Sequence, residues 1–260
     1  MKLRVAVVGA GRAGSLFVEA YGKDDRVAEI VVVEPHAPLR EKAAAMPKVV
    51  ALYAEAEEFF ARDGADLVSI QSSTARHCEQ FLAAARAGAH IYIQKPLAER
   101  FEDLTAICEA ARANAGRKMA VCHNYRRESY SGHMKRLIDE GALGRLLCIR
   151  AGYISDYYWT WTVEPPTAYV DPKGFYKTRH AITDGGCHHL DLANWFLGER
   201  PTQVWARRLS FRQEKFEADW ISALYAYPGG TTLHMDASWA MVAPHKENFG
   251  IEVYGTEGSI

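Results

Sequence analysis

Acid–base side chains gather in one short segment, Thr183-Asp184-Gly-Gly-Cys-His188-His189-Leu-Asp191. Asp184 and His188 are four residues apart and His188 and Asp191 are three apart, so all three share one face if the segment is helical. An imidazole between two carboxylates can relay a proton near neutral pH. Gly185 and Gly186 leave space for a flat ring to approach. The spacing therefore predicts a proton-transfer site centred on His188.

Two other interpretations of this segment stay open. Asp184 or Thr183 can cap a helix, with His188 a hydrogen-bonded core histidine and Asp191 its partner. A metal site made of His188, His189 and Asp191 is disfavoured because adjacent side chains on a helix diverge by about 100°. We therefore expect no metal here.

A lysine that can be aimed at a ligand follows a short apolar run in Gln94-Lys95-Pro96. The carboxyl ends of strands in an open α/β sheet are where ligands bind. A residue before proline is held in an extended or turn conformation, which would direct the Lys95 ammonium. A surface lysine at a strand end is the alternative, and the local pattern alone favours it.

A glycine-rich turn, Gly9-Ala-Gly11-Arg-Ala-Gly14, follows the apolar run at 3–8. In this pattern the first glycine allows the tight turn, the second lets the backbone approach a pyrophosphate, and the third lets helix and strand pack closely. Glu34 follows Gly14 by 20 positions, the spacing of a carboxylate that binds the adenosine ribose. The pattern predicts a dinucleotide site, and Glu34 favours NAD over NADP. A glycine-rich turn without a nucleotide is the alternative.

The elements that would position these residues alternate along the first half of the chain. Short β-branched runs between alanine-rich stretches are typical of βαβ units and a parallel sheet. We expect strands over 3–8, 29–33, 67–70, 91–93 and 119–121, and helices over 13–21, 39–45, 54–62, 78–87 and 101–113.

The pattern changes near residue 123. A helix over 131–140 is followed by alternating segments at 146–154, 203–211, 221–227 and 231–239, with one helix at 187–197. Alternation indicates a largely antiparallel sheet with one exposed face. The sequence thus predicts an α/β protein: a doubly wound Rossmann domain over 1–122, and over 123–260 an α+β domain for substrate binding and oligomerisation.

The composition is that of a globular chain: 260 residues, 31 Lys+Arg against 32 Asp+Glu and a formal net charge of −1. This balance argues against an electrostatic nucleic-acid binder. No apolar run approaches the roughly 20 residues that span a bilayer, and the start does not resemble a signal peptide. The five cysteines are scattered without a Cys-x-x-Cys pair, which argues against a disulfide framework or a thiolate zinc site. We expect a cytoplasmic protein with reduced thiols.

Several motifs occur in a characteristic order. The glycine fingerprint is followed by His77…Ala87-Gly88-Ala-His-Ile-Tyr-Ile-Gln94-Lys95-Pro96, Leu137-Ile-Asp-Glu-Gly-Ala-Leu-Gly144, Asp184-x-Gly-x-His188-x-x-Asp191 and Tyr254-Gly-Thr-Glu-Gly-Ser259. Together they resemble the glucose–fructose oxidoreductase / inositol dehydrogenase / rhizopine-catabolism (Gfo/Idh/MocA) family of NAD(P)-dependent sugar and polyol dehydrogenases. The resemblance covers nearly the whole chain.

This resemblance implies a role for each matching residue. Lys95 contacts the substrate hydroxyl, His188 is the general acid/base, and Asp184 hydrogen-bonds the substrate. In oxidation the substrate C–H delivers hydride to the nicotinamide while His188 takes the hydroxyl proton, and Lys95 favours the developing alkoxide. The Lys95-Pro96 peptide is implied to be cis. The residues implied to bind the cofactor are Gly9, Gly11, Arg12, Ala13, Gly14, Glu34, Ser72, His77, Gln94 and Lys95.

Other substrate contacts are expected from the second half. Arg126 is a candidate, although arginines are usually exposed, which favours the alternative of a solvated pair with Arg127. The aromatic-rich segment 153–176 suits sugar stacking, a dimer interface or a packed loop equally.

The sequence also departs from the family pattern. Gln94 replaces the usual glutamate, and Thr178-Arg179-His180 replaces a usual glycine stretch, which suits an acidic or phosphorylated substrate. The chain ends at Ile260, where relatives continue, so a sheet edge would need cover from a partner in a homo-dimer or homo-tetramer.

We therefore expect an NAD(P)-dependent oxidoreductase of a sugar, polyol or related cyclic hydroxyl compound. The alternatives are an NAD-using glycosidase or lyase without net redox turnover, and a nucleotide-sensing regulator.

Overall fold

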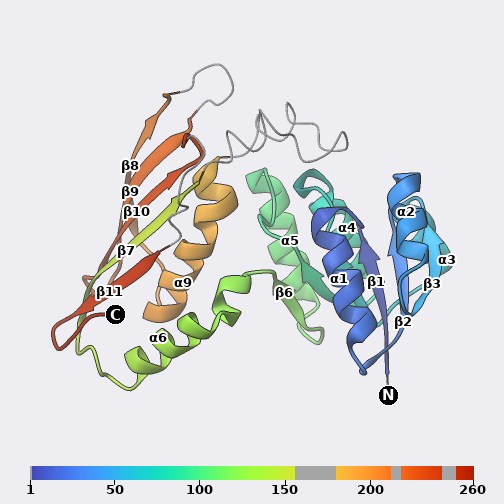
Figure 1. Cartoon of the computed structure of the whole chain (residues 1–260), viewed down its shortest axis with the longest axis horizontal. Coiled ribbons are helices and arrows are strands. Elements are labelled where there is room, and N and C mark those ends of the chain that lie inside the picture. Colours follow the sequence, from blue (N-terminus) through green and yellow to red (C-terminus); the bar gives the residue numbers. More distant parts are fainter. Residues whose placement is uncertain (1, 156–179, 212–217, 242–249) are drawn as a thin grey trace. The chain divides into compact units, whose positions relative to one another are not determined.

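The computed structural model describes residues 2–155, 180–211, 218–241 and 250–260. The chain folds as two compact units, Met1–Cys122 and His123–Ile260 (Figure 1). Most of the aromatic-rich segment 153–176, and also Thr178 and Arg179, lie outside the described residues.

A parallel sheet of six strands forms the centre of the first unit, in the order β3-β2-β1-β4-β5-β6. The strands are β1 (Leu3–Val8), β2 (Val27–Val33), β3 (Val49–Tyr53), β4 (Leu67–Ile70), β5 (His90–Ile93) and β6 (Met119–Val121). The helices between them are α1 (Arg12–Lys23), α2 (Ala37–Ala44), α3 (Ala56–Arg62), α4 (Thr74–Arg86) and α5 (Phe101–Ala113). The order reverses between β1 and β4, so the loops after these two strands are neighbours at the carboxyl edge.

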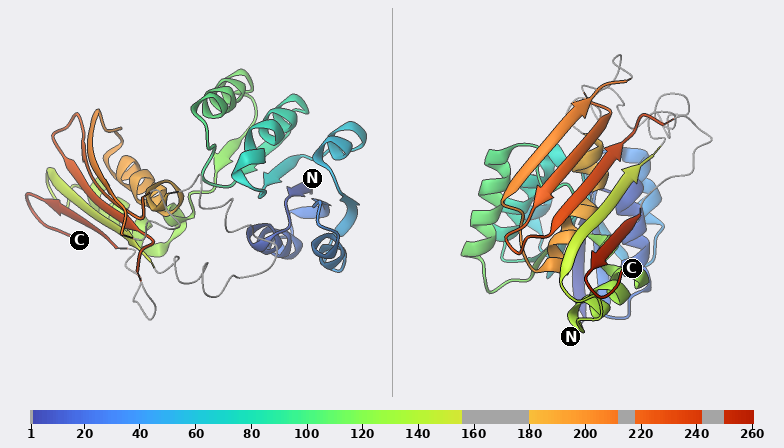
Figure 2. Two further views of the ribbon diagram at one scale, coloured as in Figure 1. Left: turned by 90° about the horizontal axis from the view of Figure 1, so that it is seen from above. Right: turned by 90° about the vertical axis from the view of Figure 1, so that its left-hand side faces the viewer.

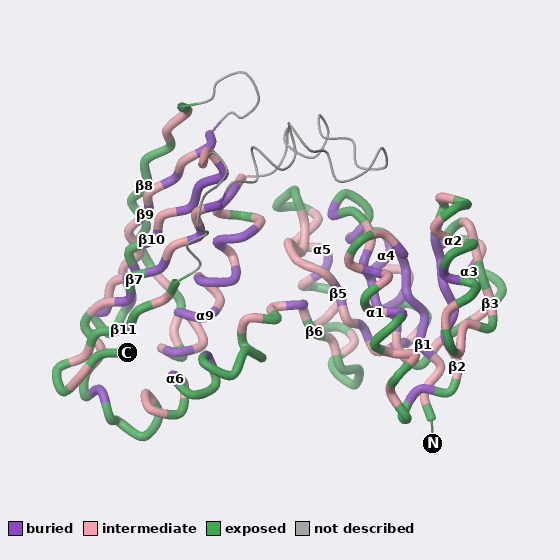
Figure 3. Tube along the Cα trace, viewed as in Figure 1, coloured by how far each residue is buried: buried purple, intermediate pink, exposed green. Residues whose placement is uncertain are grey.

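Both faces of this sheet are covered by helices. Val5 and Val7 of β1 pack with residues of α1 and α2, whereas Ala6 and Val8 pack with residues of α3, α4 and α5. A strand buried on both faces needs apolar side chains on both, which explains the continuous apolar run Val5-Ala-Val-Val8 in β1. Figure 3 shows this burial along β1 and β2.

A mixed sheet of five strands forms the centre of the second unit, in the order β11-β7-β10-β9-β8. Strands β7 and β10 are parallel, and the other three neighbouring pairs are antiparallel. The strands are β7 (Leu146–Ile154), β8 (Gln203–Leu209), β9 (Trp220–Ala226), β10 (Thr232–Ser238) and β11 (Ile251–Gly255). The right-hand view of Figure 2 shows these strands side by side, with one face turned to the viewer.

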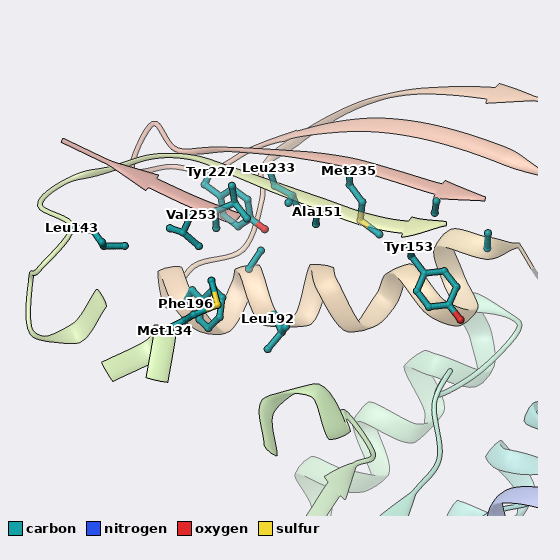
Figure 4. Packing of buried hydrophobic residues seen from close by; sticks show 14 of the residues in the cluster. Met134, Leu143, Ala151, Tyr153, Leu192, Phe196, Tyr227, Leu233, Met235 and Val253 are labelled. Carbon is teal, nitrogen blue, oxygen red and sulfur yellow. The ribbon is translucent and has the colours of Figure 1, made fainter. Parts of the chain in front are cut away.

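Helix α9 (Cys187–Leu197) packs against the opposite face of this sheet. Leu233 and Met235 of β10 and Val253 of β11 lie between the sheet and the helix, together with Tyr227, which follows β9 (Figure 4). Three further elements complete the described part of the unit: the 3-10 helix η1 (Asn124–Arg127), helix α6 (Ser129–Asp139) and the π-helical turn η2 (Ile182–Gly186).

The predicted fold class is confirmed: a doubly wound parallel sheet is followed by a largely antiparallel one. The expected strands at 3–8, 67–70, 119–121 and 146–154 match β1, β4, β6 and β7 at both ends. Strands β3 and β11 were not predicted from the sequence. Both lie at sheet edges: β3 is a short apolar run of half-buried and exposed residues, whereas β11 alternates between apolar and polar residues.

All five cysteines are free thiols. In the part of the chain that the structure describes, no helix has both the length and the apolar character needed to cross a membrane.

Candidate active site

The glycine turn joins β1 to α1 and packs against the loop after β4. Gly9 has φ +92°, and a Cβ built on it would lie 2.7 Å from the backbone of Ser72. A Cβ on Gly14 would lie 1.8 Å from the carbonyl oxygen of Gly9, so the start of α1 lies directly against the turn. These two glycines are therefore required by the packing of the first unit itself.

Gly11 differs from the other two glycines because a Cβ built on it would meet no atom within 4 Å. Gly11 is the N-cap of α1, and the first turn of that helix, which holds Arg12 and Ala13, contains no acidic residue. Open space beside backbone amides at the positive end of a helix suits an anion such as a pyrophosphate. The local structure therefore fits the cofactor that the fingerprint predicts.

Glu34 lies at the end of β2 with 2% of its surface exposed. Its carboxylate accepts a hydrogen bond from the Ala10 amide at 2.7 Å and another from the His36 amide at 2.9 Å. Arg40 donates to the carbonyl oxygen of Glu34 at 2.7 Å. The carboxylate therefore ties the glycine turn to β2, a structural role that the sequence did not predict. A carboxylate oxygen can in general accept more than one hydrogen bond, which is the chemistry that binding a ribose hydroxyl requires.

His77 holds together the loops that follow β4 and β5. Its ring is fully buried, with Nδ1 3.0 Å from the Pro96 carbonyl oxygen and Nε2 3.2 Å from that of Ser72. Ser72 donates its hydroxyl to Gln80 at 2.5 Å. His77, an expected cofactor ligand, is therefore buried between the loops after β4 and β5, where its ring contacts backbone carbonyl oxygens of both loops.

Lys95 follows β5 at the same edge of the sheet as the glycine turn. The Lys95-Pro96 peptide is cis, as the resemblance implied. Gln94 accepts from the Lys95 amide at 2.9 Å and donates to the side chain of Gln71 at 3.2 Å; Gln71 in turn donates to Ser69 at 3.0 Å. A neutral amide at position 94 can accept and donate at once, so Gln94 links the lysine turn to the end of β4.

In the second unit, Asp184 lies in the π-helical turn η2 and His188 in the first turn of α9. Single π turns occur frequently at functional sites. A Cβ on Gly185 would lie 2.0 Å from the ring of Tyr153, and one on Gly186 would lie 2.2 Å from the terminal methyl of Met235. The space left by these glycines is therefore filled by the sheet's own side chains, whereas the sequence suggested a ligand ring.

His188 is 5% exposed and is flanked by aromatic rings. The Tyr125 ring stacks on it, with centroids 4.3 Å apart and planes at 14°. The His123 ring meets it edge-on at 5.7 Å. Both neighbours come from the segment at η1, about 60 residues before His188, and no spacing signal in the sequence pointed to them.

The carboxylate of Asp191, predicted as the second carboxylate beside His188, is paired with Arg126 in the structure. Arg126 donates to both oxygens of Asp191, at 2.6 and 2.7 Å, and its guanidinium lies 5.6 Å from the centre of the Trp195 ring. Asp191 also lies 3.9 Å from Nε2 of His123. Arg126, a candidate substrate contact, thus joins η1 to α9 rather than extending as a solvated side chain.

Two family models match the chain. Residues 3–123 match "Oxidoreductase family, NAD-binding Rossmann fold", and residues 132–260 match "GFO/IDH/MocA C-terminal domain".

Among curated relatives, levoglucosan dehydrogenase from Pseudarthrobacter phenanthrenivorans is 34% identical over 51% of this chain and 33% of its own length. The scyllo-inositol 2-dehydrogenase (NAD(+)) of Bacillus subtilis is 26% identical over 100% of this chain and 73% of its own. For the first three curated relatives, the match spans between 33% and 59% of their lengths.

The fold is shared with solved structures. Scyllo-inositol dehydrogenase from Lactobacillus casei, solved with NAD(H) and scyllo-inositol, superposes with a TM-score of 0.86 at 20% identity, covering 100% of this chain and 76% of the other.

Proposed function

The chain belongs to the GFO/IDH/MocA oxidoreductase family, and we propose that it transfers a hydride between NAD and a hydroxyl-bearing carbon of a sugar, polyol or related cyclic compound. One observation carries the proposal: the Gly9–Gly11 turn, Ser72 and Lys95 follow the adjacent strands β1, β4 and β5. The reversal of strand order between β1 and β4 is where such sheets bind dinucleotides.

Gly11 and the first turn of α1, with Arg12 and Ala13, would hold the pyrophosphate, and Glu34 would accept from the ribose hydroxyls. A negative carboxylate at that position opposes a 2′-phosphate, which supports NAD over NADP. Bound NAD would supply the hydride acceptor. The protein's task is then to orient the substrate and to move its hydroxyl proton.

We assign that proton to His188, with Asp184 as a substrate hydrogen-bond partner and Lys95 as the cation that stabilises the alkoxide. Stacking on Tyr125 fixes the plane of the His188 ring. Relatives named levoglucosan dehydrogenase and scyllo-inositol 2-dehydrogenase (NAD(+)) support a cyclic polyhydroxylated substrate and NAD.

The test begins with calorimetric titration of the nucleotide-stripped protein with NADH and NADPH, followed by a panel of sugars and polyols read by net NADH formation. We expect NADH to bind more tightly than NADPH. Lys95→Ala and His188→Ala should each lower kcat/KM by about 10²–10⁴-fold, the usual contribution of a proton-transfer group. Binding of neither nucleotide would overturn the proposal. Reaction of a glycoside without net NADH would instead indicate transient redox chemistry.

Arg126 provides a further test within the second unit. Arg126→Gln should raise KM if the arginine contacts substrate, whereas a purely structural role in holding Asp191 would lower thermal stability without a selective change in KM. Arg127→Gln is the matched control, because Arg127 is exposed and adjacent.

We also propose a cytoplasmic homo-oligomer formed through the face of the second sheet that α9 does not cover. That face carries a shallow hollow of about 400 Å³ lined by Arg150, His234, Asp236 and Glu252, whose mixed charges suit pairing with a second copy. Trp205 is 55% exposed on β8, the edge strand of the same sheet. Trp205→Glu should shift the protein toward monomer in light-scattering measurements, and an unchanged mass would rule out a contact at this tryptophan.

A further inference from the structure

Three metal-binding side chains meet beside the start of α9. His123 precedes η1, and Cys187 and His188 are the first two residues of α9. One potential ligand atom from each lies within 4.8 Å of the other two, and this is the only such group of His, Cys, Asp or Glu side chains found among the described residues. Imidazole and thiolate are preferred ligands of Zn²⁺. We propose that His123, Cys187 and His188 bind a zinc ion.

The spacing of these atoms is close to what zinc requires. Tetrahedral sites with Zn–N near 2.0–2.1 Å and Zn–S near 2.3 Å place their ligand atoms about 3.4–3.6 Å apart. Atoms separated by at most 4.8 Å need to approach by little more than about 1 Å, which side-chain rotation supplies. Three protein ligands leave a fourth position for water, as in sites that are not purely structural.

The surroundings hold the ligands in place. Asp191 Oδ1 lies 3.9 Å from His123 Nε2, so a shift of somewhat less than about 1 Å would let this carboxylate accept from one nitrogen of the imidazole while the other binds a metal. Asp191 is paired with Arg126, which neutralises the guanidinium charge that would otherwise repel a cation. The Tyr125 ring limits the orientations of His188.

The site could not be predicted from the sequence, because its ligands do not form any recognisable spacing pattern. The cysteine has no Cys-x-x-Cys partner, and the third ligand lies 64 positions before it in the chain. Adjacent residues diverge on a helix, which argues against a joint site of His188 and His189. Cys187 and His188 are also adjacent, yet His123 lies where atoms of both can reach it.

Zinc binding would exchange the thiol proton of Cys187 for the metal ion. The Cys187 S–H bond breaks, a Zn–S bond forms, and one proton passes to solvent, while both imidazoles bind in their neutral forms. A zinc-bound His188 could not accept a substrate proton. Zn²⁺ would therefore inhibit the dehydrogenase, and this consequence alone rests on the proposed function.

The experiment is a Co²⁺ titration of the full chain after dialysis against a chelator, followed by the thiolate-to-cobalt charge-transfer absorption and by Zn²⁺ competition. We expect one metal ion per chain, bound with charge-transfer absorption. Loss of an orienting outer partner costs 10–100-fold in affinity, so Cys187→Ser and His123→Ala, which remove direct ligands, should cost at least about 100-fold. Cys148→Ser is the matched control because it removes a partly buried thiol of the same unit, on β7. Circular dichroism melting checks that each variant is folded.

Three results would overturn the site: no stoichiometric binding, charge-transfer absorption that persists in Cys187→Ser, or absorption that Cys148→Ser abolishes. Activity is measured separately, as the Zn²⁺ concentration that halves NADH formation. Cobalt binding through Cys187 without turnover would support the metal site and count against the proposed function. Turnover without metal binding would do the reverse.

Discussion

Gly11→Ala and Gly14→Ala should separate cofactor binding from folding. A Cβ at position 14 would lie 1.8 Å from the Gly9 carbonyl oxygen and 2.7 Å from its carbon, so the backbone itself would have to move. A Cβ at position 11 would meet nothing within 4 Å. The protein therefore has space for a side chain at position 11, and a bound pyrophosphate would compete for that space.

Gly14→Ala should mainly lower the stability of the protein, whereas Gly11→Ala should mainly lower its affinity for NADH. Overpacking costs about 1–3 kcal/mol, and a rigid backbone neighbour puts Gly14→Ala near the upper end. For a chain of this size that corresponds to a fall in Tm of about 5–10 °C. At Gly11 the loss of a favourable N-cap residue and the gain from a less flexible unfolded chain are each about 1 kcal/mol or less and opposite in sign. Stability should stay nearly constant, while NADH affinity falls at least about tenfold, or 1.4 kcal/mol.

Calorimetric NADH titration and thermal unfolding measure the two quantities. Gly64→Ala is the control, because its Cβ also meets nothing within 4 Å but it lies in the loop after α3. This control should leave both quantities unchanged. Wild-type NADH affinity in Gly11→Ala would refute the placement of the pyrophosphate, and wild-type stability in Gly14→Ala would refute the packing described for the turn.

Three further predictions concern other residues of the two units. Glu34→Ala removes the acceptor of two backbone amides and should lower the unfolding free energy by about 2–3 kcal/mol and weaken NADH binding, measured by urea unfolding and calorimetry. Gly185→Ala should cost about 1–3 kcal/mol, and adding Tyr153→Ala should restore part of it; strictly additive losses in the double-mutant cycle would contradict the contact. The side-chain hydrogen bond from Arg26 lowers the pKa of Asp24 from the ordinary 3.8 to about 2. The stabilisation from the Asp24 carboxylate is therefore complete above pH 3.8 and is lost as the pH falls through about 2, so Asp24→Asn should make the free energy of unfolding less dependent on pH between these values, measured by urea unfolding.

The parallel sheet could be predicted from the sequence because its signal is local. A central strand covered on both faces is a short, mostly apolar run, as β1 and β4 are, and such runs can be recognised in the sequence. Strand β11 is an edge strand paired only by β7, and its alternation of apolar and polar residues is short and weak. Strand β3 is an apolar run, Val49-Val-Ala-Leu-Tyr53, but it is short and lies between two helical segments, where a strand cannot be told from a continuing helix by periodicity alone. The wide turn η2 was also missed, because helical spacing does not distinguish a π turn from an α turn.

The site was predicted where its parts are consecutive and missed where they are not. Gly9, Gly11 and Gly14 form one turn, so their type and spacing describe most of it. The structural roles of Glu34 and His77 depend on loops from other strands. The pairing of Asp191 with Arg126 joins residues 65 positions apart, which no pattern within one helix could indicate.

The segment at η1 controls His188 through several weak contacts that act together. The Arg126–Asp191 pair is partly exposed and contributes about 1 kcal/mol or less, and the stack of Tyr125 on His188 contributes about 0.5–1.5 kcal/mol. Their sum, about 0.5–2.5 kcal/mol, corresponds to roughly a 2- to 70-fold preference for one orientation of the imidazole. At the upper end of this range, loss of the stack leaves about 1 kcal/mol and loss of the ion pair about 1.5 kcal/mol, which still favours the bound orientation about 5- to 13-fold, whereas loss of both removes the preference. At that upper end, the loss of correctly oriented His188 in a variant lacking both contacts should therefore exceed the sum of the losses in the two single variants, because the oriented fraction saturates while the free energies add.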